Sequence, residues 1–123
     1  MILVDTSVWI DHLRAGDSTL VELLSKGQVL THPFVIGELA LGNLRQRDVV
    51  LDTLSNMPKA RIAADDEVLA YISQRKLYGM GIGYIDAHLL ASVRLTPNTR
   101  LWSRDKRLCA AAEQLNLLAA LEH

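Results

Sequence analysis

Several features that would narrow the class of this 123-residue chain are scarce or missing. A single cysteine, Cys109, excludes an intramolecular disulfide and a zinc site built from several cysteines. Lysine and arginine number 13 and aspartate and glutamate 14, so the net charge of −1 argues against a globally basic nucleic-acid binder but allows a local basic patch. No apolar run reaches about 18 residues, so we expect no membrane-spanning helix.

The sequence also lacks repeats, linkers and low-complexity segments, which predicts a single domain over residues 1–120. The opening residues MILVDTS contain no basic segment and place an acid at position 5. We therefore expect no signal peptide and a cytoplasmic location. Residues 121–123, Leu-Glu-His, resemble the start of an expression tag, and we interpret them as a tag remnant.

Short apolar runs alternate with longer segments of helical period, a pattern typical of a parallel sheet with crossover helices. We expect strands at residues 2–4, 29–30, 61–63, 100–103 and 117–118. We expect helices at about residues 6–13, 18–25, 33–44, 47–56, 65–77, 84–95 and 105–115. The pattern therefore predicts the α/β class.

Two acidic residues follow expected strands. Asp5 comes directly after the first strand, and Asp105 comes two residues after the strand at 100–103. Ligand sites of open parallel sheets gather at the carboxyl ends of the strands, so these two carboxylates can converge there. The alternative is that each acid only caps the helix that follows it.

Two further acids lie in segments that are almost free of charge. Glu38 is the only charged residue of PFVIGELALGNL (33–44), and Asp86 is the only acid of GYIDAHLLASV (83–93). Each can alternatively be the exposed residue of a largely buried helix. Four carboxylates in one cleft would repel one another unless a cation lay among them. Because oxygen ligands suit Mg²⁺ or Mn²⁺, we predict a metal site from Asp5, Glu38, Asp86 and Asp105.

Basic residues surround the last of these acids. The segment RLWSRDKR (100–107) contains four, and Arg104 and Arg107 are our candidates for contacts with phosphate groups. Cations beside an acidic metal pocket suit a polyanionic substrate, although the same pattern also fits a solvated helix start. The glycine-rich segment 79–83 does not match the dinucleotide fingerprint, and we interpret it as a loop that delivers Asp86. We expect His32 and His88 to be solvated or hydrogen-bonded and not metal ligands.

Four segments resemble, in order, the signature blocks of PIN domains. They are LVDTSVWIDHL (3–13), VIGELALGNL (35–44), GYIDAHLLASV (83–93) and LWSRDKRL (101–108). More narrowly, they resemble the VapC toxins of bacterial VapBC toxin–antitoxin pairs. The resemblance covers nearly the whole chain.

The resemblance implies a three-layer α/β/α sandwich with a central parallel sheet, and a ribonuclease that hydrolyses RNA phosphodiester bonds with Mg²⁺ or Mn²⁺. By position, Asp5 and Asp86 would bind the metal directly, and Glu38 and Asp105 would complete its shell directly or through water. Thr6 matches the hydroxyl residue after the first acid, and Ser103 matches the one before the last acid. The implied partners are RNA, a cognate antitoxin protein and a second copy of the chain, with no membrane.

Three other classes of protein share parts of this pattern. A Mg²⁺-binding phospho-receiver-like signalling domain, without nuclease activity, has similar length and fold. It needs an acceptor aspartate after the third strand, where this chain has Asp65 and Asp66 after the expected strand. It also needs a lysine near the end of the fifth strand, but no downstream Lys-Pro pair exists. A haloacid dehalogenase needs Asp-x-Asp-x-Thr after the first strand, where this chain has Asp-Thr-Ser. A purely structural or DNA-binding module is the third alternative; the chain lacks a basic recognition helix, and this alternative leaves the four acids unexplained.

Overall fold

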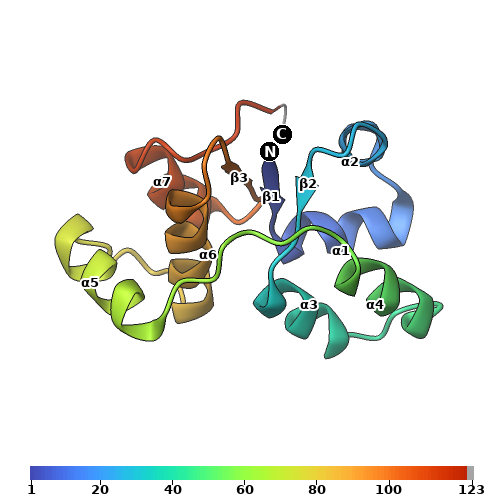
Figure 1. The fold of residues 1–123 in the computed structure, drawn as a ribbon, viewed down its shortest axis with the longest axis horizontal. Coiled ribbons are helices and arrows are strands. Elements are labelled where there is room, and N and C mark those ends of the chain that lie inside the picture. Colours follow the sequence, from blue (N-terminus) through green and yellow to red (C-terminus); the bar gives the residue numbers. More distant parts are fainter. Residues whose placement is uncertain (122–123) are drawn as a thin grey trace.

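A computed structural model describes residues 1–121, which contain three strands and seven helices (Figure 1). The strands are β1 (Ile2–Val4), β2 (Val29–Leu30) and β3 (Arg100–Trp102). The helices are α1 (Thr6–Ala15), α2 (Ser18–Ser25), α3 (Pro33–Ala40), α4 (Arg47–Ser55), α5 (Asp65–Arg75), α6 (Tyr84–Leu95) and α7 (Lys106–Gln114). The tag interpretation of residues 121–123 falls mainly on Glu122 and His123, which lie outside the described residues.

The three strands form one parallel sheet in the order β2-β1-β3. In the central strand, Leu3 pairs with Leu30 on one side and with Leu101 on the other. Leu3 and Val4 are fully buried, as expected for a short apolar strand covered on both faces. The central position of β1 therefore carries the next residue, Asp5, to the middle of the carboxyl edge of the sheet.

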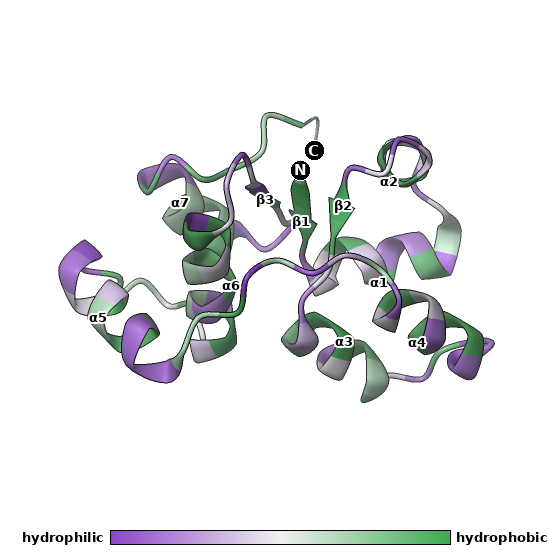
Figure 2. Cartoon of the chain, in the orientation of Figure 1, coloured by the Kyte–Doolittle hydropathy of each residue, from purple (hydrophilic) through white to green (hydrophobic). Residues whose placement is uncertain are grey.

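The helices surround this sheet, and the predicted α/β sandwich is confirmed. In Figure 1, α5, α6 and α7 gather beside β3, whereas α1 to α4 lie on the side of β2. Figure 2 shows β1 and β2 as hydrophobic and β3 as mixed, and it shows hydrophilic residues at both ends of α5. Among the described residues, no helix has the length and apolar character needed to cross a membrane.

Two expected strands are reduced or absent. Residues 61–63 form no strand, because pairing near them is limited to one isolated bridge between Thr31 and Lys59. The backbone N–H of Arg61 is instead bonded to the Thr96 hydroxyl, 2.9 Å away. The strand expected at 117–118 likewise consists of one bridge, between Leu101 and Leu118.

The helix expected over 33–44 ends earlier than predicted, at Ala40. Gly42 and Asn43 follow, and neither residue favours a helix interior. The early end releases the segment 41–46 as a loop at the C-terminal end of α3, close to Glu38.

Candidate active site

Asp5 is the most enclosed of the four predicted acids, with 5% of its surface exposed. Its Oδ2 atom accepts hydrogen bonds from the hydroxyls of Ser7 at 2.7 Å and Ser103 at 2.8 Å. Asp5 occupies the N-cap position of α1, yet its side chain makes no capping hydrogen bond. The two hydroxyls therefore hold the carboxylate in one orientation at the sheet edge, and helix capping does not explain this acid.

Glu38 is held near Asp5 by the residue that begins α1. The Thr6 hydroxyl donates a hydrogen bond to Glu38 Oε1 at 2.7 Å, which connects α1 to α3. Thr6 directly follows Asp5 in the sequence, but its hydroxyl contacts Glu38 in the structure.

Asp86 lies in the first turn of α6, and its Oδ2 accepts a hydrogen bond from the backbone N–H of Gly83 at 3.2 Å. Burial raises the pKa of Asp86 above its ordinary value, and the negative charges of Asp5, Asp105 and Glu38 raise it further. The Gly83 hydrogen bond acts in the opposite direction. Asp86 therefore lies within electrostatic reach of the other three acids, although no hydrogen bond joins it to them among the described residues.

Asp105 contributes both to the helix that follows it and to this region. Its Oδ1 accepts hydrogen bonds from the backbone N–H groups of Arg107 and Leu108, so the capping interpretation is confirmed for this acid. Its own N–H donates to the Ser103 hydroxyl at 3.0 Å. Since the Ser103 hydroxyl also donates to Asp5, one buried serine connects the first acid to the last.

The donor chemistry of this cluster fits a hard divalent cation. All four side chains supply carboxylate oxygens, which Mg²⁺ and Mn²⁺ prefer, and a cation would relieve the repulsion among them. As they stand, no three acidic, histidine or cysteine side chains within residues 1–121 are close enough to enclose a metal ion. The metal-binding roles of the four acids therefore stay a prediction.

The two histidines near these helices are hydrogen-bonded, as expected. His32 is fully buried; its Nδ1 accepts from the N–H of Phe34, and its Nε2 lies 3.1 Å from the Ser92 hydroxyl. Burial, with a smaller effect of the charge on His88, lowers the pKa of His32 to about 4. His88 contacts Asp65 at 3.2 Å. Among the described residues, no hydrogen bond joins either imidazole to Asp5, Glu38, Asp86 or Asp105.

The two candidate phosphate-binding arginines differ sharply. The guanidinium of Arg104 bonds Asp11 at 2.8 Å and also bonds Asp17, and it lies over the ring of Trp102. Two carboxylates already balance its charge, and these ion pairs join α1 and α2 to the end of β3; the phosphate contact of Arg104 stays a prediction. Arg107 forms no ion pair among the described residues and is exposed, so it is the better candidate.

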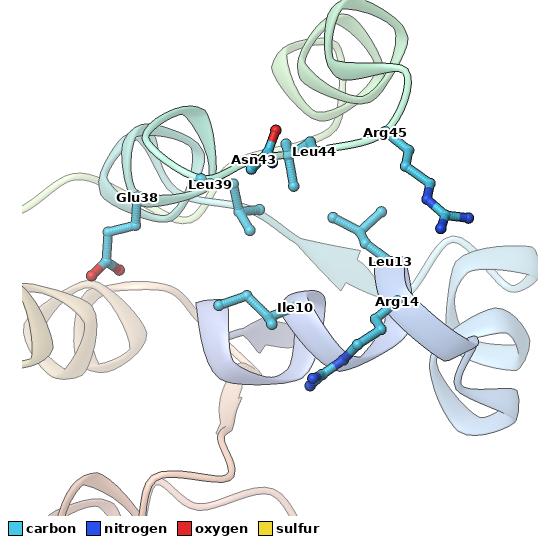
Figure 3. Close-up of a pocket in the computed structure, with 9 residues that line it drawn as sticks. Ile10, Leu13, Arg14, Glu38, Leu39, Asn43, Leu44 and Arg45 are labelled. Atoms are coloured by element: carbon cyan, nitrogen blue, oxygen red, sulfur yellow. The ribbon is translucent and has the colours of Figure 1, made fainter.

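A hollow of about 390 Å³ adjoins Glu38 (Figure 3). Its apolar lining comes from α1, α3 and the loop after α3, through Ile10, Leu13, Leu39 and Leu44. In Figure 3 these side chains face one another, whereas the carboxylate of Glu38 points away from them and the guanidinium groups of Arg14 and Arg45 lie toward the edges. The sequence did not reveal this hollow, because its aliphatic residues follow the same pattern as core residues.

Comparison with known proteins matches residues 2–114 to the PIN domain family model. The chain is also similar to proteins named Ribonuclease VapC32 from two strains of Mycobacterium tuberculosis, CDC 1551 / Oshkosh and ATCC 25618 / H37Rv. Each is 54% identical to it over 122 residues, which span 99% of this chain and 98% of the relative.

Proposed function

Because the chain belongs to the PIN-domain family, we propose that it is a divalent-metal-dependent endoribonuclease, acting as one domain over residues 1–120 and as the toxin of a toxin–antitoxin pair. The observation that carries this proposal is the position of Asp5 and Asp105 just beyond the carboxyl ends of two paired strands, β1 and β3. Hydrogen bonds through Ser103 connect Asp5 to Asp105, and Thr6 connects the start of α1 to Glu38. The identity of the VapC32 relatives as ribonucleases supports RNA as the substrate.

We assign the direct metal contacts to Asp5 and Asp86, and the completion of the shell to Glu38 and Asp105. When bound, Mg²⁺ or Mn²⁺ supplies an activated water and polarises the phosphoryl oxygen. The chain contributes orientation: Ser7 and Ser103 donate to Asp5 and hold its carboxylate in place. Hydrolysis by this route needs no nucleophilic side chain.

The phospho-receiver alternative has little support in the structure. Asp65 and Asp66 do not follow a strand but lie in the first turn of α5. Asp65 is also bonded to Tyr84 and His88, at 3.2 Å in each case.

The proposal is tested by incubating the purified protein and an RNA substrate with Mn²⁺ or Mg²⁺. We expect endonucleolytic cleavage that EDTA abolishes, because removing the cation leaves only mutually repelling carboxylates at the site. Incubation with acetyl phosphate is the control for a receiver domain. Stable phosphorylation without RNA cleavage would overturn the proposal, whereas cleavage without any effect on bacterial growth would remove only the toxin role.

We further propose that the partners are a cognate antitoxin and a second copy of the chain, in the cytoplasm. For the antitoxin, we propose that an apolar segment with acidic neighbours occupies the hollow beside Glu38. Its lining residue Ile10 leaves 48% of its surface exposed, and Arg45 at one edge suits an acidic side chain, whereas Arg14 at another edge is already paired with Asp11. A segment bound there would lie against the wall of the active site.

The Ile10→Asp variant is expected to weaken antitoxin binding by about tenfold or more, because it places a charge among aliphatic side chains at the centre of the contact. Isothermal titration with the protein encoded by the neighbouring reading frame measures the effect. Val21→Asp is the matched control, since Val21 is similarly exposed but lies on α2, outside the hollow. Equal affinities of the two variants would place the antitoxin elsewhere.

A further inference from the structure

Arg107 lies directly against a glycine of the loop before α6. It is the second residue of α7 and comes two residues after Asp105. A Cβ atom on Gly81 would lie 2.9 Å from Cδ, 3.1 Å from Nη1 and 3.2 Å from Nε of this arginine. The first distance is shorter than real Cβ contacts and the other two are tight, so an alanine at position 81 would push the end of the Arg107 side chain aside.

This contact joins the segments that carry two of the acids. Gly81 belongs to the loop 79–83, whose last residue, Gly83, donates its N–H to Asp86. Arg107 belongs to the helix that Asp105 caps. The Arg107 side chain thus packs against the loop that leads to Asp86, and no ion pair within residues 1–121 neutralises its charge as two acids neutralise that of Arg104.

We propose that Gly81 is a positioning residue that lets Arg107 lie across the loop and present its guanidinium to an RNA phosphate beside the one that is cleaved. This inference rests on the proposed ribonuclease function. A guanidinium already packed against backbone loses less freedom when it binds than a side chain moving freely in solvent. Gly81 therefore acts through Arg107 and does not touch the RNA itself.

The matched control is available in the same loop. Gly79 and Gly81 have nearly identical positive φ angles, +75° and +78°, so alanine strains the backbone similarly at both positions. A Cβ at Gly79 would meet nothing within 4 Å, whereas a Cβ at Gly81 would displace Arg107. A difference between Gly81→Ala and Gly79→Ala therefore reports on the arginine and not on the loop strain.

The experiment compares kcat and KM for a single-stranded RNA, with Mn²⁺ and across a range of salt concentrations, for wild type and for G79A, G81A, R107A and the double variant G81A/R107A. We expect R107A and G81A to raise KM at low salt by about tenfold and to flatten the salt dependence of kcat/KM by about 0.7 to 1 in logarithmic slope. G79A should keep the wild-type slope. The double variant, in which the steric conflict is absent, should match R107A.

The positioning role of Gly81 would be overturned if the salt dependence of kcat/KM had the same slope in G81A as in G79A while the slope of R107A was flattened. A loss of kcat in G81A without a change in slope would also overturn it, because the loop would then act on Asp86 and not on Arg107. Wild-type protein that fails to cleave RNA at all would instead overturn the proposed function, and the inference with it.

Discussion

Replacement of Asp86 by asparagine is expected to abolish metal-dependent RNA cleavage, lowering the rate by at least about a hundredfold, while the fold persists. The amide keeps the shape of the side chain and can still accept a hydrogen bond from Gly83, but it loses the negative charge that a cation needs. Asp5→Asn is expected to have a comparable effect, because Asp5 is buried and held by two hydroxyls.

The measurement is the initial rate of cleavage of one RNA substrate with Mn²⁺, with circular dichroism to verify folding. Asp66→Asn is the control, because Asp66 is an exposed first-turn acid of α5 that lies outside the acid cluster. Folded Asp5 and Asp86 variants that both cleave RNA at the wild-type rate would show that these acids do not form the active site.

Metal-free Asp86→Asn protein is expected to melt at a higher temperature than metal-free wild type. Burial and the charges of Asp5, Asp105 and Glu38 raise the pKa of Asp86 above its ordinary value of 3.8, despite the opposing Gly83 hydrogen bond. An acid with a raised folded pKa destabilises the native state above that pKa, and the effect fades as the pH falls below the unfolded value. The stability gain of the variant should therefore be present at neutral pH and disappear in acid.

With metal added, wild type should melt at a higher temperature than the Asp86→Asn variant. Mg²⁺ or Mn²⁺ at a hundred times its dissociation constant should stabilise wild type by roughly 2.7 kcal/mol, whereas the variant should gain much less. Thermal melts in EDTA, across a metal titration and at neutral and acid pH measure both effects. A variant that melts lower than wild type in EDTA, yet responds equally to metal, would identify Asp86 as an ordinary helix-start acid.

Three strands of the sheet and the elements that carry the four acids could be predicted from the sequence because their signals are local. Asp5 follows an unbroken apolar run, and Glu38 and Asp86 are isolated charges in apolar segments. The prediction of a strand at 61–63 is wrong. A run of three residues is too short to show whether a neighbouring strand will pair with it, and the structure has only one isolated bridge nearby, at Lys59.

The contacts of Arg104, Ser7 and Gly81 could not be predicted from the sequence, because they join distant segments of the chain. Arg104 reads as one of several cations near Asp105, and its two partners, Asp11 and Asp17, precede it by about ninety residues. Ser7 reads as a helix-start residue, yet its hydroxyl donates to Asp5 and accepts the N–H of Arg104. The steric relation of Gly81 to Arg107 depends on the packing of a loop against a helix, which no periodic pattern records.

The position of β3 has a consequence for biosynthesis. The central strand occupies residues 2–4, but its neighbour on one side is made only at residues 100–102, and the Ser103 bond to Asp5 spans 98 positions of the chain. A nascent chain that has not reached this point lacks the third strand, Ser103 and Asp105. If the chain is the nuclease proposed above, the ribosome translating it is not exposed to a finished active site until residues 100–105 have been made.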